Sequence, residues 1–145
     1  MSAADNSEAM LEITAEILKD AGFDCSVSRQ DIEALTFEPE SFDTVLSFRL
    51  FHHFPRADIR RRVVAEVCRV AASRVVISYY NSRSLNYVRR RLRDGLKGKS
   101  YKKYGIPLFE LKGYFADHGF SLVEEFAQQR YLKPLHIAVF ERKGH

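Results

Sequence analysis

The chain has 145 residues, of which 46% are apolar and 29% are charged. This length suits one domain with its own core, and this composition excludes fibrous and disordered proteins. No apolar run is long enough for a membrane span, and the acidic start lacks the basic and apolar regions of a secretion signal. Cys25 and Cys68 lack the spacing of a disulfide framework or a zinc site. We therefore expect a single cytoplasmic domain over residues 1–145.

Charge is distributed unevenly along the sequence. Residues 1–45 carry eleven acidic and two basic side chains, a net charge of −9, whereas residues 46–145 carry a net charge of +13. Such asymmetry favours either a solvated basic face or an acidic ligand or surface that meets the basic part of the chain.

The first part of the chain predicts, in order, a helix over 7–21, a short strand over 23–27, a polar connection over 30–42 and a buried strand over 44–48. Ser7 is a suitable N-cap for the helix, and Gly22 ends it. Apolar side chains at helical spacing predict its core-facing side: Met10, Ile13, Ile17, Leu18 and Ala21.

The second part predicts a helix over 56–70, a strongly β-branched strand over 74–80, a basic helix over 85–96, a loop over 97–107, a helix opened by Pro107, and an antiparallel pair over 121–128 and 135–141. In the helix over 56–70 we expect Ile59, Val63, Val67 and Val70 to face inward. We expect Arg60, Arg61 and Arg62 to face outward.

Strand and helix alternate until the final pair. This order predicts an α/β fold, with a Rossmann-like, mostly parallel sheet, helices on both faces and a C-terminal antiparallel hairpin. Ligands of such sheets bind at the carboxyl ends of the strands.

Polar side chains occur at three such ends. Asp5 lies between a short strand and a helix, Asp31 follows the next strand, and the segment SFRLFHHF follows the third. A carboxylate such as Asp5 can accept both hydroxyls of a ribose. Asp31 can accept from an exocyclic amine while Ile32 contacts the face of a ring. Two simpler readings stay open: Asp5 as a cap near the helix, and Asp31 as an Asx-turn residue.

In this order and spacing, DNSEAML, DIEALTFEPESFDTVLSFRLFHHF and RVVIS resemble the class I S-adenosylmethionine-dependent methyltransferases, in particular the methyltransferase type 11 group. The resemblance implies that Asp5, with its neighbour Asn6, binds the cofactor ribose, and that Asp31 and Ile32 hold the adenine. It also implies that Ser47, Phe48 and Arg49 approach the methionine part of the cofactor. Our leading hypothesis is therefore direct transfer of the sulfonium methyl group to a small-molecule or lipid-like acceptor, although the sequence does not identify the acceptor itself.

The sequence departs from this family at its start. The family has a first strand that ends in a glycine-rich turn, and no such glycine cluster occurs in these 145 residues. Only glycine tolerates cheaply the backbone conformations of that turn. We therefore expect a truncated fold without the usual first strand and weak cofactor binding. For the exposed sheet edges three outcomes stay open: the sheet closes up, two copies pair as a homodimer, or the chain is marginally stable.

The adjacent His52 and His53 follow the strand over 44–48. A metal site needs further ligands, and His118, His136 and His145 lie far away in the sequence, so we expect no metal. An imidazole titrates near pH ~6.5, so either histidine is a candidate catalytic base, while methyl transfer itself needs little more than alignment.

A basic run with interleaved tyrosines extends over 83–103. The family resemblance places this region on the acceptor side, and its charge suits an anionic or lipid-like acceptor, while the absence of nucleic-acid motifs disfavours RNA. Two alternatives to the enzyme stay open. The first is an inactive methyltransferase-like module that serves as a partner or regulator. The second is a basic module that binds a membrane or RNA.

Overall fold

The computed structural model describes residues 1–96, 103–129 and 131–144. The chain divides into two compact units, residues 1–36 and 37–145, and each is described by itself. None of the helices in the described ranges is both long enough and apolar enough to cross a bilayer.

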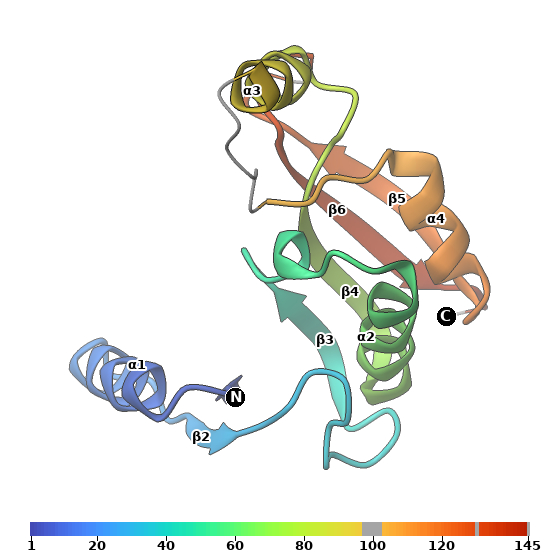
Figure 1. Ribbon diagram of the computed structural model, residues 1–145. Coiled ribbons are helices and arrows are strands. Elements are labelled where there is room, and N and C mark those ends of the chain that lie inside the picture. The colour runs from blue at the N-terminus through green and yellow to red at the C-terminus, as the bar shows by residue number, and fades with distance from the viewer. Residues whose placement is uncertain (97–102, 130, 145) are drawn as a thin grey trace. The chain divides into compact units, whose positions relative to one another are not determined.

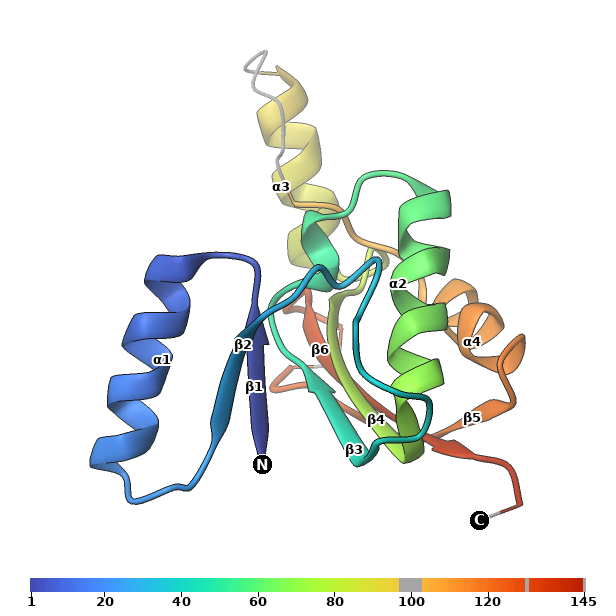
Figure 2. The same ribbon diagram turned by 90° about the horizontal axis from the view of Figure 1, so that it is seen from below.

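The first unit is a strand–helix–strand unit: β1 Ser2–Asp5, α1 Glu8–Asp20 and β2 Ser26–Arg29. β1 and β2 are parallel, and their register pairs Ser2 with Ser26 and Asp5 with Arg29. The carboxyl ends of both strands therefore lie at the same edge of this small sheet (Figure 2).

The predicted strand over 23–27 is wrong in position, because β2 begins at Ser26. Phe23 instead belongs to the C-terminal cap of α1. Gly22 adopts a left-handed φ of 76°, and the N–H of Phe23 donates to the carbonyl of Leu18 at 2.9 Å. This is the hydrogen-bond pattern of a Schellman motif, which keeps Phe23 out of the extended strand.

The predicted inner face of α1 is wrong except at Leu18, which is half-buried. Met10, Ile13 and Ile17 are 48%, 49% and 62% exposed, and no residue of α1 is buried. Leu11, Thr14 and Leu18, one helical line further round, are the half-buried ones. Two strands of four residues cover only a narrow part of a helix surface, so most of the apolar side chains of α1 stay exposed.

The second unit contains, in order, β3 Phe42–Ser47, the short 3-10 helix η1 Phe51–His53, α2 Ala57–Val70, β4 Ala71–Tyr80, α3 Leu85–Leu96, α4 Leu108–Ala116, β5 Phe120–Phe126 and β6 Leu135–Arg142. Its strands form one sheet in the order β3-β4-β6-β5. β3 and β4 are parallel, whereas β6 is antiparallel to both β4 and β5. The α/β class and the C-terminal hairpin are confirmed.

α2 and α4 pack beside each other against the sheet, where the core of this unit lies (Figures 1 and 2). Val63 and Val67 of α2 and Leu111 of α4 are fully covered. Phe115 stacks on Phe140 of β6, with ring centroids 3.8 Å apart. As predicted, α4 begins directly after Pro107.

Arg60 does not face outward as predicted. It is only 9% exposed, and its Nη1 donates to the carbonyls of Phe54 and Pro55 at 3.1 and 3.0 Å. Its Nη2 donates to Glu110 of α4 at 3.1 Å. A buried charge of this kind requires such partners, and they tie the loop after η1 to both helices.

The basic helix over 85–96 is confirmed as α3. The predicted loop over 97–107 is described only from Lys103 onward, and residues 97–102 lie outside the described residues. Within the described chain, β1 pairs only with β2, and β3 pairs only with β4.

Candidate functional site

Asp5 and Asp31 lie at the shared carboxyl edge of the first unit. β1 ends at Asp5, and the N–H of Gln30, directly after β2, donates to the carbonyl of Asp5 at 3.1 Å. The two strands therefore bring Asp5, Asn6 and the start of the segment after β2 together, as the sequence predicted for parallel neighbours.

The Asp5 side chain faces the start of α1. Its Oδ1 accepts the N–H of Ser7 at 2.8 Å, while Ser7 itself makes no side-chain cap and accepts the N–H groups of Met10 and Leu11 only through its carbonyl. Asn6 Oδ1 lies 3.5 Å from Arg29 Nε. One oxygen of Asp5 is thus used locally, before the start of α1. The other oxygen of this exposed carboxylate makes no hydrogen bond to the described residues.

Asp31 is held in a turn. Its Oδ1 accepts the N–H of Glu33 at 2.9 Å, and its carbonyl accepts the N–H of Ala34 at 3.0 Å, so the Asx-turn reading is confirmed as geometry. This turn fixes the direction of an exposed carboxylate beside the half-buried Ile32. A rigid acceptor next to an apolar side chain suits an exocyclic amine on a flat ring.

The end of β3 carries a sharp backbone change. Arg49 adopts a φ of 57°, a conformation that is uncommon for residues other than glycine. Its N–H donates to Ser78 Oγ of the neighbouring strand at 2.6 Å. The buried Ser47 hydroxyl has no hydrogen-bond partner among the described residues, and Phe48 is 51% exposed. This segment therefore presents a fixed backbone, an unpaired hydroxyl and an exposed ring.

The two histidines of η1 differ in their surroundings. His52 is 2% exposed and stacks on Tyr80, with ring centroids 4.4 Å apart and planes at 17°. Burial, and then the nearby His53, Lys103 and Arg49, lower the pKa of His52 to about 4. His52 is therefore neutral near pH 7, and its buried Nδ1 has no partner in the described chain. His53 is exposed beside it, with ring centroids 4.3 Å apart.

A segment that sequence reasoning did not connect with the histidines crosses this end of β4. Lys103 Nζ donates to the Tyr80 hydroxyl at 3.2 Å, and the N–H of Tyr104 donates to the carbonyl of His52 at 2.8 Å. A Cβ on Gly105 would lie 2.8–2.9 Å from the Tyr87 ring and the Tyr80 carbonyl, so only glycine fits this crossing. The one available signal was the mixture of Lys, Tyr and Gly after the basic helix.

The structure thus gathers the candidate residues in two groups. The first unit holds Asp5, Asn6, Asp31 and Ile32, and the second holds Ser47, Phe48, Arg49, His52 and His53. Within the described residues, no three His, Cys, Asp or Glu side chains are grouped as a metal site would need. The first group offers hydrogen-bond acceptors for a polar ligand, and the second offers cationic and aromatic groups around a neutral imidazole.

The fold is similar to several solved methyltransferases. Magnesium protoporphyrin IX methyltransferase (ChlM) from Synechocystis PCC 6803 with bound SAH matches with a TM-score of 0.83 and 18% identity, over 98% of this chain and 64% of that chain. A structure of the same enzyme with bound SAM gives a TM-score of 0.72 and 16% identity, over 98% and 59%. A SAM-dependent methyltransferase from Methanosarcina mazei gives 0.77 and 15%, over 97% and 81%.

At these identities the likeness shows the fold, and the chain spans less than two thirds of the length of ChlM. Comparison with curated proteins gives no match. A family model described as a methyltransferase domain matches residues 1–74, from β1 into β4. That match includes both groups of candidate residues, and the expected family resemblance is confirmed. The chain belongs to the methyltransferase domain family, whose cofactor is S-adenosylmethionine.

Proposed function

We propose that the chain is an S-adenosylmethionine-dependent methyltransferase domain acting on a small-molecule or lipid-like acceptor, and that its two units form one domain. The observation that carries this proposal is the placement of polar side chains at the carboxyl ends of β1, β2 and β3 in a chain of this family.

The residues present fit the parts of this cofactor. Asp5 and Asn6 suit the ribose hydroxyls, because a carboxylate and an amide can accept both. Asp31, oriented by its turn, suits the adenine amine, and Ile32 suits the face of the adenine ring. The unpaired Ser47 hydroxyl and the segment through Arg49 suit the polar methionine part. When bound, S-adenosylmethionine would supply a methyl group activated by its sulfonium.

The acceptor side belongs to the second group. Lys103 and Arg49 give it a positive character near His52, which favours an anionic or polar acceptor. His52, held neutral by burial, is suited to positioning rather than to taking a proton at pH 7. The exposed His53 is the better candidate for a proton acceptor, since a catalytic base must reach its substrate. The Synechocystis relative is named for a small-molecule acceptor, magnesium protoporphyrin IX.

The adenine assignment is tested by calorimetric titration of the chain and of Asp31→Ala with SAH. Losing a charged acceptor should weaken binding by about 1–3 kcal/mol. Asp24→Ala, which removes an exposed carboxylate before β2, is the matched control and should leave binding unchanged. Equal affinities for the chain and for Asp31→Ala would remove Asp31 from the site. No binding by the unmodified chain would favour the inactive partner module.

A further inference from the structure

α3 has an apolar stripe that the described residues leave exposed. Leu85, Val88, Leu92 and Leu96 recur at intervals of three or four residues, so they lie on one line along the helix. Their exposed fractions are 59%, 43%, 65% and 89%. Tyr87, the buried residue of this helix, lies on the opposite side, where its hydroxyl accepts the N–H of Gly105 at 2.8 Å. The stripe therefore points away from its own unit.

Arginines flank the stripe. Arg89 and Arg93 follow one of its sides and Arg91 the other, at the angles that 3.6 residues per turn dictate. No carboxylate of the described chain makes an ion pair with Arg89, Arg90 or Arg91, whereas Arg93 pairs with Asp94 at 3.3 Å. An open hollow of about 580 Å³ adjoins these arginines, lined by Asn86, Arg89, Arg90, Arg93 and Pro134.

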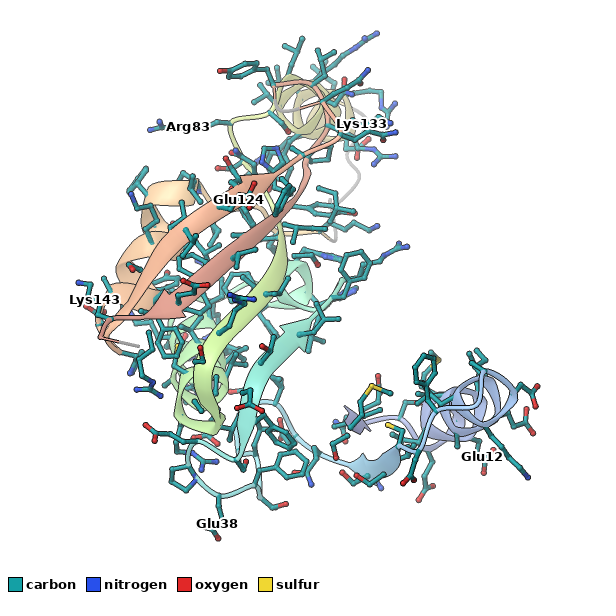
Figure 3. The ribbon with its side chains drawn as sticks, turned by 180° about the vertical axis from the view of Figure 1, so that it is seen from behind. Glu12, Glu38, Arg83, Glu124, Lys133 and Lys143 are labelled. Atoms are coloured by element: carbon teal, nitrogen blue, oxygen red, sulfur yellow. The ribbon has the colours of Figure 1, made fainter. Side chains whose placement is uncertain are left out.

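The turn between β5 and β6 extends the same surface. The carbonyls of Tyr131 and Leu132 accept the N–H groups of Leu85 and Asn86 at 2.8 and 3.1 Å, which fixes the turn to the first turn of α3. The side chains of Tyr131 and Leu132 are 80% and 43% exposed. Figure 3 places Lys133 beside α3, where nitrogen-bearing side chains project outward.

We propose that α3 and the turn over 131–134 form a docking surface for an anionic phospholipid bilayer. An amphipathic helix with leucines on one face and arginines beside them lies in the plane of a membrane interface, with its apolar face among the upper acyl chains. The arginine-lined hollow gives lipid phosphates a place at the level of the headgroups. Tyr131, apolar with a polar tip, suits the same depth.

This occupant fits better than the alternatives because the surface combines two features. A nucleic acid would be attracted by the arginines but would gain nothing from four exposed aliphatic side chains in a line. A second copy of the chain would cover the stripe but would bring the same arginines against each other, which is unfavourable. The proposal is independent of cofactor binding.

The test is flotation of the full chain with two kinds of vesicle, phosphatidylcholine alone and phosphatidylcholine mixed with phosphatidylserine. We expect binding to the mixed vesicles that weakens with salt, and little binding to phosphatidylcholine alone. Arg89→Gln and Arg91→Gln, which alter one arginine on each side of the stripe, should each weaken binding about fivefold, the effect of one basic side chain near an anionic surface. Leu92→Ser with Leu96→Ser should abolish binding at every salt concentration.

Two matched controls keep the result specific. Lys112→Gln removes an exposed charge on α4, and Val123→Ser removes an exposed apolar side chain on β5, so both should bind like the unmodified chain. Because every altered side chain is exposed, circular dichroism should show an intact fold.

Three outcomes would overturn the proposal. One is no preference for the mixed vesicles. The second is binding to duplex RNA that is stronger than vesicle binding and unaffected by Leu92→Ser. The third is a dimer in light scattering that Leu92→Ser dissociates.

Discussion

The two units of the chain differ in how their side chains are covered. Every buried residue of the described chain lies in the second unit, whereas the first has none, and its helix exposes Met10, Ile13 and Ile17. Both units nevertheless carry candidate site residues. A helix on two short strands is marginally stable by itself. The side chains proposed for the adenosine part of the cofactor therefore belong to the less stable first unit. The candidate residues around the histidines belong to the more stable second unit.

The difference in burial between the two units is tested by truncating one large apolar side chain in each unit. Phe140→Ala removes a fully buried ring that stacks on Phe115, and it should lower the free energy of unfolding by about 3–5 kcal/mol. Ile17→Ala removes a side chain that is 62% exposed, and it should change the free energy by at most about 0.5 kcal/mol. Urea denaturation measures both. Similar losses would mean that the first unit has a core after all.

Several elements could be predicted because their signals are local. The β-branched run predicted β4, Pro107 predicted the start of α4, and Lys133 and Pro134 between two strand-like runs predicted the hairpin of β5 and β6. The position of His52 and His53 after the carboxyl end of β3 was predicted from element order alone.

Other features depend on contacts that no local pattern contains. Phe23 looks like a strand residue but serves the cap of α1, and Arg60 looks like a surface residue until Glu110 is brought beside it. Likewise, nothing in the sequence spacing shows that Lys103 reaches Tyr80, since the two are 23 residues apart.

The contribution of Arg60 to the stability of the second unit can be measured by substitution. Arg60→Ala should destabilise the chain by about 2–4 kcal/mol, because two loop carbonyls lose their buried donor and Glu110 keeps, among the described residues, only the Tyr114 hydroxyl as a side-chain donor. Arg62→Ala, which removes an exposed ion-pair partner on the same helix, is the control and should have little effect. Thermal unfolding would compare them. Equal melting temperatures would contradict the role given to Arg60.

Substitutions at two glycines test how closely the segment over 103–105 packs beside Tyr80 and Tyr87. Gly105→Ala should cost about 1–3 kcal/mol, because the added methyl group collides with the Tyr87 ring and the Tyr80 carbonyl. Gly113→Ala, in α4 with no atom near the added methyl group, should instead stabilise the chain by about 0.5–1 kcal/mol. Chemical denaturation of both variants would show opposite signs. A loss at both positions would contradict the crossing at Gly105.

The most gradual expected effect is the pH dependence that His52 gives the second unit. The unfolded chain takes up a proton on His52 near pH 6.5, but the folded chain does so only near its pKa of about 4. Stability should therefore fall as the pH drops between these values, by at most about 1.4 kcal/mol per pH unit from this group.

His52→Phe keeps an aromatic ring against Tyr80 but cannot titrate, so its stability should fall less over this window. His118→Gln changes an exposed histidine and should follow the unmodified chain. Denaturation at several pH values measures the slopes. Parallel curves for all three proteins would show that His52 titrates normally.

The central proposal is that the chain binds S-adenosylmethionine at the candidate residues of its two units. The most direct measurement is an NMR titration of the isotope-labelled chain with SAH, which also reports weak binding. We predict shifts in the backbone amides of Asn6, Ser7 and Ile32, and shifts in those of Phe48 and Arg49. Unchanged amide signals at these positions at a high concentration of SAH would contradict cofactor binding by these residues.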